Sequence, residues 1–152
     1  MPQIPLTTRT ADDRPLVIFD YTPFDRPAVA QPITFVVPRG YRFQIMSLYA
    51  SIVTDANVAD RVLYIQISGP NGPFFRFQPP FLITASETRY VTAAPGIAQV
   101  AHSATNMSAV LPIPSGIVLE EGTIFTLGLV NAQAGDQLSA GVVQLLSQFV
   151  AE

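Results

Sequence analysis

The chain holds few residues that could act as catalytic or metal-binding groups. Among its 152 residues there is one histidine, His102, and no cysteine. A Ser-His-acid triad is formally available, but no nucleophile motif such as G-x-S-x-G accompanies His102. With one His and no Cys a zinc site is close to excluded, and the acids lack the spacing of a calcium loop. We therefore expect no enzyme, no catalytic residue, no metal and no cofactor.

Two adjacent acidic pairs, Asp12-Asp13 and Glu120-Glu121, are the next candidates for chemistry. Neighbouring residues on a strand point to opposite faces, so each pair is better interpreted as solvated turn charges. The two carboxylates of a glycosidase come from distant strands, and spacing alone does not exclude them. The chain has no Trp, however, which removes the usual platform for stacking a sugar. Gly69-x-x-Gly72 lacks the helix and the Lys of a phosphate loop, so it predicts a hairpin turn.

The composition favours a chain whose surface is covered by other chains. Hydrophobic residues make up 49% and charged residues 12%, about half of the ~25% that is usual in soluble domains. A compact monomer needs more charged surface than this to stay dispersed. The net charge of −3 argues against nucleic acid as a partner. All 8 basic residues are Arg, which suits interface ion pairs, although genome composition can produce the same bias.

Targeting and membrane signals are not visible in the chain. The amino terminus lacks a basic region followed by an apolar run, so no signal peptide is predicted. The longest apolar runs, such as 73–77 and 142–146, are far shorter than the ~20 residues that a membrane helix needs. We expect no membrane partner.

The strongest structural pattern runs from Pro38 to Ser68 and predicts a long β-hairpin. Tyr41, Phe43 and Ile45 alternate with polar residues, and the apolar phase then shifts by one residue to Met46, Leu48, Ala50 and Ile52. A one-residue change of phase inside a strand predicts a β-bulge. The return arm places Leu63, Ile65 and Ile67 on one face, together with Arg61.

The remaining segments also favour strands, because 14 prolines disfavour long helices. Residues 136–150 fit either a strand or a helix capped by Asp136, and the all-β context favours a strand. The fold class predicted is therefore all-β, a single β-sandwich or jelly-roll-like barrel over residues 33–152. Strands are expected at 33–37, 74–77, 81–92 and 123–131, a loop that could include a short strand at 97–110, and turns at 69–73, 93–96, 111–116 and 120–122.

Residues 1–32 are predicted as an extended, proline-rich N-terminal arm. Prolines recur through the segment and its one clear strand pattern is Leu16 to Asp20. It is too apolar for a solvated tail. One interpretation is an ordered first strand in its own domain. The other, slightly favoured, is an arm that lies across a neighbouring subunit, where prolines reduce the entropy lost on docking.

An aromatic cluster, Phe74, Phe75 and Phe77 around Arg76, follows the predicted turn at 69–73. Such a cluster could form a ligand platform or a cation–π contact. The interpretation that we favour is core packing with an interface lip, because aromatic residues dominate burial in both.

An ordered set of short sequence motifs between residues 38 and 150 resembles the small β-sandwich decoration proteins of tailed-phage heads, which are also called cementing or auxiliary proteins. These motifs are Pro38-Arg39-Gly40-Tyr41-Arg42, Asp60-Arg61-Val62-Leu63, Gly69 to Gly72, Leu111-Pro112-Ile113-Pro114, Leu119-Glu120-Glu121-Gly122 and Ala134-Gly135-Asp136. The resemblance implies a jelly-roll-like virion protein, often a homotrimer. Such a protein is made in the host cytoplasm and binds the major capsid protein on the outer surface of the assembled shell.

The resemblance implies no catalytic residues, and it does not identify the residues that meet the capsid. Our hypothesis for the oligomer or capsid interface is taken from the apolar arm and the aromatic cluster: Ile4, Leu6, Leu16, Ile18, Phe19, Phe24, Phe74, Phe75 and Arg76. One rival is a carbohydrate- or receptor-binding module of a phage fibre or baseplate, using Phe74, Phe75 and Tyr90. The other rival is a β-sandwich enzyme with a polar pocket that contains His102.

Overall fold

The computed structural model describes residues 17–23, 29–98, 100–103, 108–138 and 142–149, and these form strands and no helix. The all-β prediction is confirmed. The strands are β1 (Val17–Pro23), β2 (Ile33–Val36), β3 (Tyr41–Val53), β4 (Val62–Gly69), β5 (Gly72–Phe77), β6 (Thr88–Pro95), β7 (Val100–Ser103), β8 (Ser108–Ile113), β9 (Ile124–Val130), β10 (Gln137–Leu138) and β11 (Val142–Phe149).

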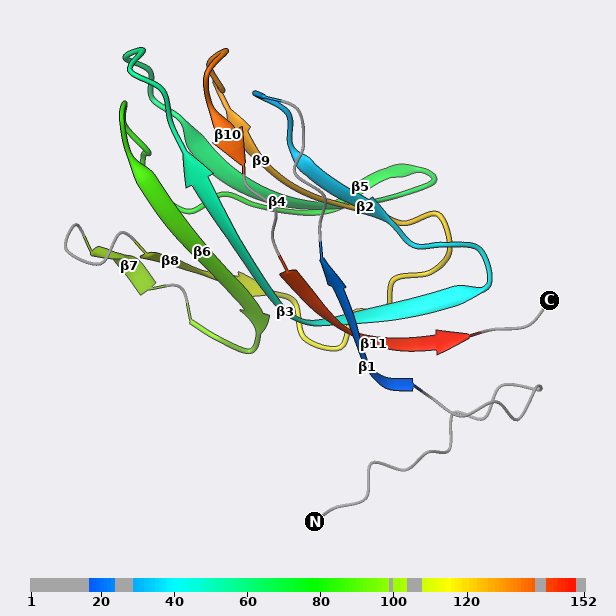
Figure 1. The fold of residues 1–152 in the computed structure, drawn as a ribbon. Helices are drawn as coiled ribbons and strands as arrows, with labels where there is room; N and C mark the ends of the chain where they lie inside the picture. The colour runs from blue at the N-terminus through cyan, green and yellow to red at the C-terminus, as the bar shows by residue number, and fades with distance from the viewer. Residues whose placement is uncertain (1–16, 24–28, 99, 104–107, 139–141, 150–152) are drawn as a thin grey trace.

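Two sheets pack face to face as a β-sandwich (Figure 1). The first, which we call sheet A, has the order β1-β11-β3-β6-β8-β7, and β10 also pairs with β3. The second, sheet B, has the order β2-β9-β4-β5. The inward-facing residues of both sheets form one core, in which the largest fully buried apolar side chain is Phe125 of β9.

The strand pairs are nested, which defines jelly-roll connectivity. β4 pairs with β5, β3 with β6, β2 with β9 and β1 with β11, all antiparallel. This is the arrangement obtained when one long hairpin is folded over so that its strands are shared between two sheets. The predicted jelly-roll-like sandwich is therefore the observed fold.

The bulge predicted in the long strand is present in β3. Ser47 pairs with Gln144 of β11 and Ile45 pairs with Leu145, so Met46 is the extra residue. Beyond it Leu48, Ala50 and Ile52 are buried, as the shifted phase predicts. Met46 itself is exposed, because the bulge turns it out of the core.

The strand predicted over Phe81 to Thr92 is wrong in its first half. Residues 81–87 form a loop whose one ladder contact is an isolated bridge between Arg61 and Ile83. Ser86 has a φ of 58°, a left-handed conformation that interrupts a strand. β6 begins at Thr88 and continues through residues 93–95, where the sequence predicted a break.

The predicted turn at 111–116 is wrong in its first half, where the structure has strand β8. Residues 111–113 were expected to turn the chain, but they extend β8, which runs parallel to β6 as far as Ile113. Among the described residues, β7 pairs with β8 at Ser108 and Val110. Within this part of the chain no β7 residue pairs with Pro112, and such a position is one in which a sheet tolerates a proline. Further along the chain, Leu119 forms an isolated bridge with Phe43 and is not part of a strand.

Both ends of the chain contribute strands to sheet A. Within residues 136–150 the structure contains β10 and β11, so the strand interpretation is confirmed and the helix is wrong. β1 pairs with β11 at the edge of sheet A, so residues 17–23 of the predicted arm lie in the chain's own sheet. The rest of the arm up to residue 28 lies outside the described residues.

Candidate functional site

The described residues contain no cluster of three or more His, Cys, Asp or Glu that could hold a metal ion. His102 lies in β7, and its side chain is not among those described. Glu120 forms an ion pair with Arg42, and Glu121 accepts a hydrogen bond from the amide of Gly40. This acidic pair therefore braces the turn before β3. Asp12 and Asp13 lie outside the described residues.

Two further features carry no chemistry of their own. A small hollow at one end of the sandwich is lined only by aliphatic side chains and a proline: Ile45, Ile67, Ile113, Pro114, Ile117 and Leu119. Among the described residues there is no helix of the length and hydropathy needed to cross a membrane.

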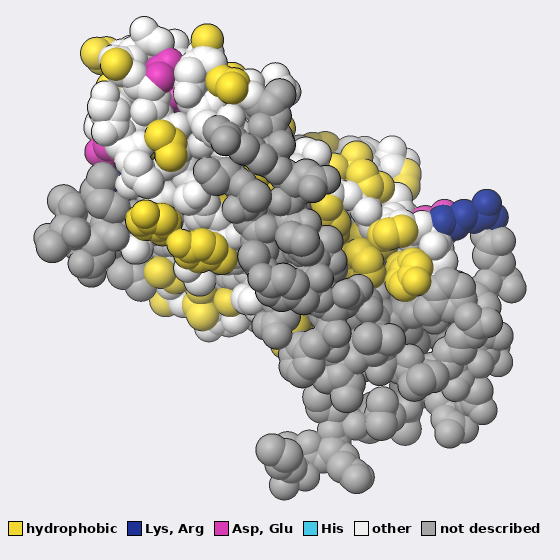
Figure 2. Space-filling model, in the orientation of Figure 1, with side chains coloured by type: hydrophobic (Ala, Val, Ile, Leu, Met, Phe, Trp, Pro, Cys, Tyr) yellow, Lys and Arg dark blue, Asp and Glu magenta, His cyan; other side chains and the backbone are white. Residues whose placement is uncertain are grey.

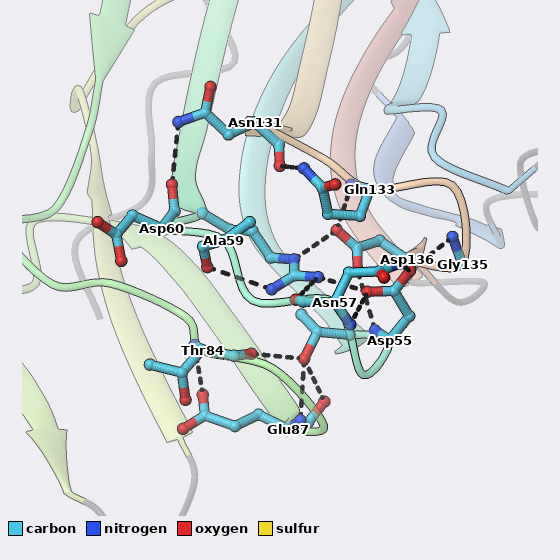
Figure 3. A network of polar contacts seen from close by, with 12 residues as sticks. Asp55, Asn57, Ala59, Asp60, Thr84, Glu87, Asn131, Gln133, Gly135 and Asp136 are labelled. Carbon is cyan, nitrogen blue, oxygen red and sulfur yellow. Dashed lines mark hydrogen bonds and ion pairs between the residues drawn. The ribbon is translucent and has the colours of Figure 1, made fainter.

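The most elaborate polar constellation is a buried ionic network around Arg61, at the end of the sandwich that carries the β3–β4 and β9–β10 loops (Figure 3). The Arg61 side chain is fully buried. Its Nε donates to Oδ2 of Asp136 at 2.6 Å, and its Nη2 donates to Oδ1 of Asp55 at 2.6 Å. The remaining contacts go to the backbone carbonyls of Asn57, at 3.0 Å, and Ala59, at 3.2 Å.

Asp136 is the second fully buried member of the network. Its carboxylate also accepts hydrogen bonds from the amides of Gln133, at 2.7 Å, and Asp55, at 2.9 Å. Burial would raise the pKa of Asp136, but these hydrogen bonds and the charge of Arg61 outweigh burial and hold the pKa below its ordinary value. Asp136 is therefore ionised at neutral pH and unsuited to act as a general acid or base there.

Thr54, next to Asp55 in the chain, connects the network to the loop before β6. The Thr54 hydroxyl donates to the carbonyl of Thr84 at 2.7 Å and accepts from the amide of Glu87 at 2.9 Å. Glu87 in turn accepts two hydrogen bonds from Arg89, at 2.7 and 3.0 Å. Burial opposes ionisation of Glu87, but the bonds from Arg89 and Thr84 hold its pKa below the ordinary value. These contacts join three loops into one rigid end.

Arg89 has one buried atom without a protein partner. Its side chain is 3% exposed and lies 6.0 Å from the centre of the Phe81 ring. The Nη1 atom makes no hydrogen bond. Apart from this atom, each arginine of the network is paired with carboxylates, and we interpret the network as a structural closure of the sandwich.

The sequence contains a signal for this network, which is the position of Arg61 on the apolar face of its strand. Arg61 was placed on the same face as Leu63, Ile65 and Ile67, and that face is the core. A charged side chain on a core face requires a buried counter-charge. The partner could not be identified from local spacing, because Asp136 lies 75 residues further along the chain.

The close approach of Gly135 to this network gives a testable prediction. A Cβ added at Gly135 would lie 2.7 Å from the Cβ of Asp55, which sits close to the backbone and has little room to move. We expect Gly135→Ala to lower the free energy of unfolding by about 1–3 kcal/mol through overpacking. Gly69→Ala is the matched control, because its nearest neighbours are side-chain atoms of Phe74 at 3.7 Å. Denaturant unfolding measures both, and equal losses would contradict the prediction.

The aromatic cluster is divided between core and surface. Phe75 and Phe77 pack against the core, and Phe74 is exposed. Arg76 forms a cation–π contact, but its partner is Tyr64 of the neighbouring strand, 4.5 Å from the ring centre, and not one of the flanking phenylalanines. Its Nη1 also donates to Gln66 at 3.0 Å. A ligand platform built from all three phenylalanines is therefore not what the structure contains.

Part of the outer face of sheet A is an uncharged surface. Along Tyr49–Val53 of β3, Thr88–Thr92 of β6 and Ser108–Pro112 of β8 the outward-facing residues are at least partly exposed, and none is an Asp, Glu, Lys or Arg. Figure 2 shows hydrophobic side chains grouped where Figure 1 places β6 and the second half of β3. We call this surface the neutral face; its residues are Tyr49, Ser51, Val53, Thr88, Tyr90, Thr92, Ser108, Val110 and Pro112.

Two exposed tyrosines lie at the centre of the neutral face. The rings of Tyr49 and Tyr90 are 6.3 Å apart and nearly parallel, with an angle of 11° between them. Each side chain is more than two-fifths exposed. The sequence analysis singled out Tyr90 but not Tyr49, since their proximity depends on the β3–β6 register.

The predicted interface residues are not gathered into one site by the described structure. Ile18 and Phe19 lie in β1, at the edge of sheet A, whereas Phe74, Phe75 and Arg76 lie in β5, at the edge of sheet B. Phe74 and Phe75 are likewise in a different sheet from Tyr90. Outside the described residues lie Ile4, Leu6, Leu16 and Phe24.

The fold and these surfaces define a jelly-roll β-sandwich with a rigid, ionically closed end and a neutral sheet face. Comparison with protein-family models, curated proteins and solved structures finds no match for this chain.

Proposed function

We propose that the chain is a structural virion protein that decorates and cements an assembled phage head as an oligomer, with a trimer as the expected state. The observation that supports this proposal most is the neutral face in a chain of which only 12% of residues are charged. The neutral face has no charge that would have to be desolvated where copies of this face meet around a symmetry axis. Jelly rolls also occur in viral capsid proteins, which is support by analogy of fold alone.

In this proposal the neutral face packs against sister copies, and other surfaces bind the shell. A cementing protein stabilises a shell because it binds the assembled lattice and not the separated subunits. Several linked copies multiply weak contacts through their effective concentration. Residues 1–16, which hold Ile4, Leu6 and Leu16 of the hypothesised interface, would reach a neighbouring subunit.

Shell binding tests this function. Shells assembled from the major capsid protein of the same virus are mixed with the full chain, and cosedimentation and the temperature of shell disassembly are measured. We expect saturable binding and a higher disassembly temperature. Deletion of residues 1–16, which keeps β1 and its pairing with β11, should weaken binding about tenfold or more. Absence of binding by the full chain would contradict the proposal.

A carbohydrate- or receptor-binding module of a fibre or baseplate is the second candidate. The observation that favours it is the exposed Tyr49–Tyr90 pair, surrounded by the hydroxyl groups of Ser51, Thr88 and Thr92. Aromatic rings beside hydroxyls can stack on and hydrogen-bond a neutral sugar. Saturable hits on a glycan array that disappear in Tyr49→Ala would favour this function over cementing.

A further inference from the structure

Val58, at the tip of the β3–β4 loop, is exposed to an unusual degree. Its side chain is 97% exposed, whereas the other large hydrophobic side chains on the described surface are 37–56% exposed. A single exposed apolar residue needs no explanation by itself. The backbone on both sides of Val58, however, is held by the buried network.

The contacts on either side leave Val58 as the unsupported tip of a braced loop. Arg61 binds the carbonyls of Asn57 and Ala59, the residues immediately before and after Val58. Asp55 accepts hydrogen bonds from both the amide and the side chain of Asn57, at 3.0 and 2.6 Å. A loop ordered before binding loses little entropy on docking, so a rigid apolar tip is suited to insertion into a pocket.

The charges around this tip indicate the chemistry of the partner. Both arginines at this end are buried: the Arg61 side chain is fully buried, and the Arg89 side chain is 3% exposed. The charged groups that reach the surface here are acidic: Asp60 is exposed, and Asp55 and Glu87, which pair with the two buried arginines, are partly exposed. With the buried Asp136, four acidic groups face two arginines, so this end keeps an excess of negative charge. An acidic rim disfavours anionic lipid headgroups and nucleic acid, and favours a protein pocket with basic side chains at its edge.

We propose that Val58 is the anchor by which this protein inserts into an apolar, basic-rimmed pocket of the shell subunit. The inference rests on the proposed function and specifies which end of the sandwich meets the shell. The network around Arg61 then has a second role, because it holds the Val58 loop ready for docking.

The test measures binding of the full chain and its variants to shells assembled from the major capsid protein of the same virus. Val58→Asp places a charge in the pocket and should weaken binding about a hundredfold or more, and Val58→Ala about tenfold. Asp60→Asn should weaken binding severalfold at low salt and reduce its salt dependence. The matched control is Val118→Asp, the same change at another exposed valine, which should bind like the parent. Its neighbour Leu119 bridges Phe43 near the start of β3, whereas Val58 follows the end of β3.

The outcomes separate this inference from the function on which it rests. Val58 makes no contact in the folded chain that its substitution would remove, so unchanged thermal unfolding of Val58→Asp is expected and is checked first. If the parent chain binds shells and Val58→Asp binds equally well, the anchor is wrong and the cementing function stands. Equal loss in Val58→Asp and Val118→Asp, or Val58-dependent flotation with phosphatidylcholine vesicles, would also overturn the anchor. If the parent chain does not bind shells, both proposals are wrong.

Discussion

Asp136→Ala is expected to lower the free energy of unfolding by about 3–5 kcal/mol, because it removes the fully buried carboxylate of the two that pair with the fully buried Arg61. In a chain of this length that loss corresponds to a fall in Tm of about 10 °C or more. The substitution also removes the acceptor for the amides of Gln133 and Asp55, so the β9–β10 and β3–β4 loops lose this connection. Calorimetry and denaturant unfolding measure the change.

The matched control removes an ion pair of the same kind at the surface. Arg42 and Glu120 are 2.7 Å apart, but their side chains are 39% and 59% exposed. Glu120→Ala should therefore cost about 1 kcal/mol or less. A loss in Asp136→Ala no larger than in Glu120→Ala would contradict a stabilising role for the buried network.

The pH dependence of the free energy of unfolding, measured for the parent chain and for Asp136→Ala, gives an independent test of the buried network. The pKa of Asp136 is lower in the folded protein than its ordinary value of 3.8. Its contribution is therefore present above the ordinary value and is lost as the pH falls through the lower, folded-state pKa. The parent chain should lose stability steeply below about pH 4. Asp136→Ala, which has no such carboxylate, should lose less over the same range.

Tyr90→Arg is expected to weaken the association of the proposed oligomer about a hundredfold or more, since it would bury a guanidinium without a partner in a neutral contact. Tyr90 is exposed in the single chain, so its substitution should leave the Tm within a few degrees of the parent. Sedimentation velocity across a concentration series measures the shift toward monomer.

Ser115→Arg is the control for Tyr90→Arg. It adds the same charge to an exposed residue of the turn after β8, which is not among the residues of the neutral face, and it should leave the sedimentation profile unchanged. An oligomer that survives Tyr90→Arg would remove the neutral face from the contact between sister copies, whichever surface replaced it.

Local patterns predicted the parts of the fold in which a strand's own alternation carries the information. The bulge at Met46 followed from the change of apolar phase in β3, and the turn between β4 and β5 followed from its Gly and Pro residues. The buried face of Leu63, Ile65 and Ile67 was visible for the same reason. These features depend on neighbours within a few residues, and sequence analysis detects such neighbours directly.

Features that depend on distant partners were missed or misassigned. The loop at 81–87 looks apolar enough for a strand, but its backbone is set by contacts with Thr54 and Asp55 from the end of β3. Residues 111–113 look like a proline turn, yet they pair in parallel with β6. The Tyr49–Tyr90 pair and the Arg61–Asp136 bond likewise follow from strand register and topology, which spacing along the chain does not contain.

We propose that sister copies cover the neutral face of this chain and that its other surfaces bind a shell. Sedimentation equilibrium of the full chain at micromolar concentration tests it most directly. We expect a mass of about three times the 16.4 kDa of one chain. A single species of 16.4 kDa at every concentration would contradict it.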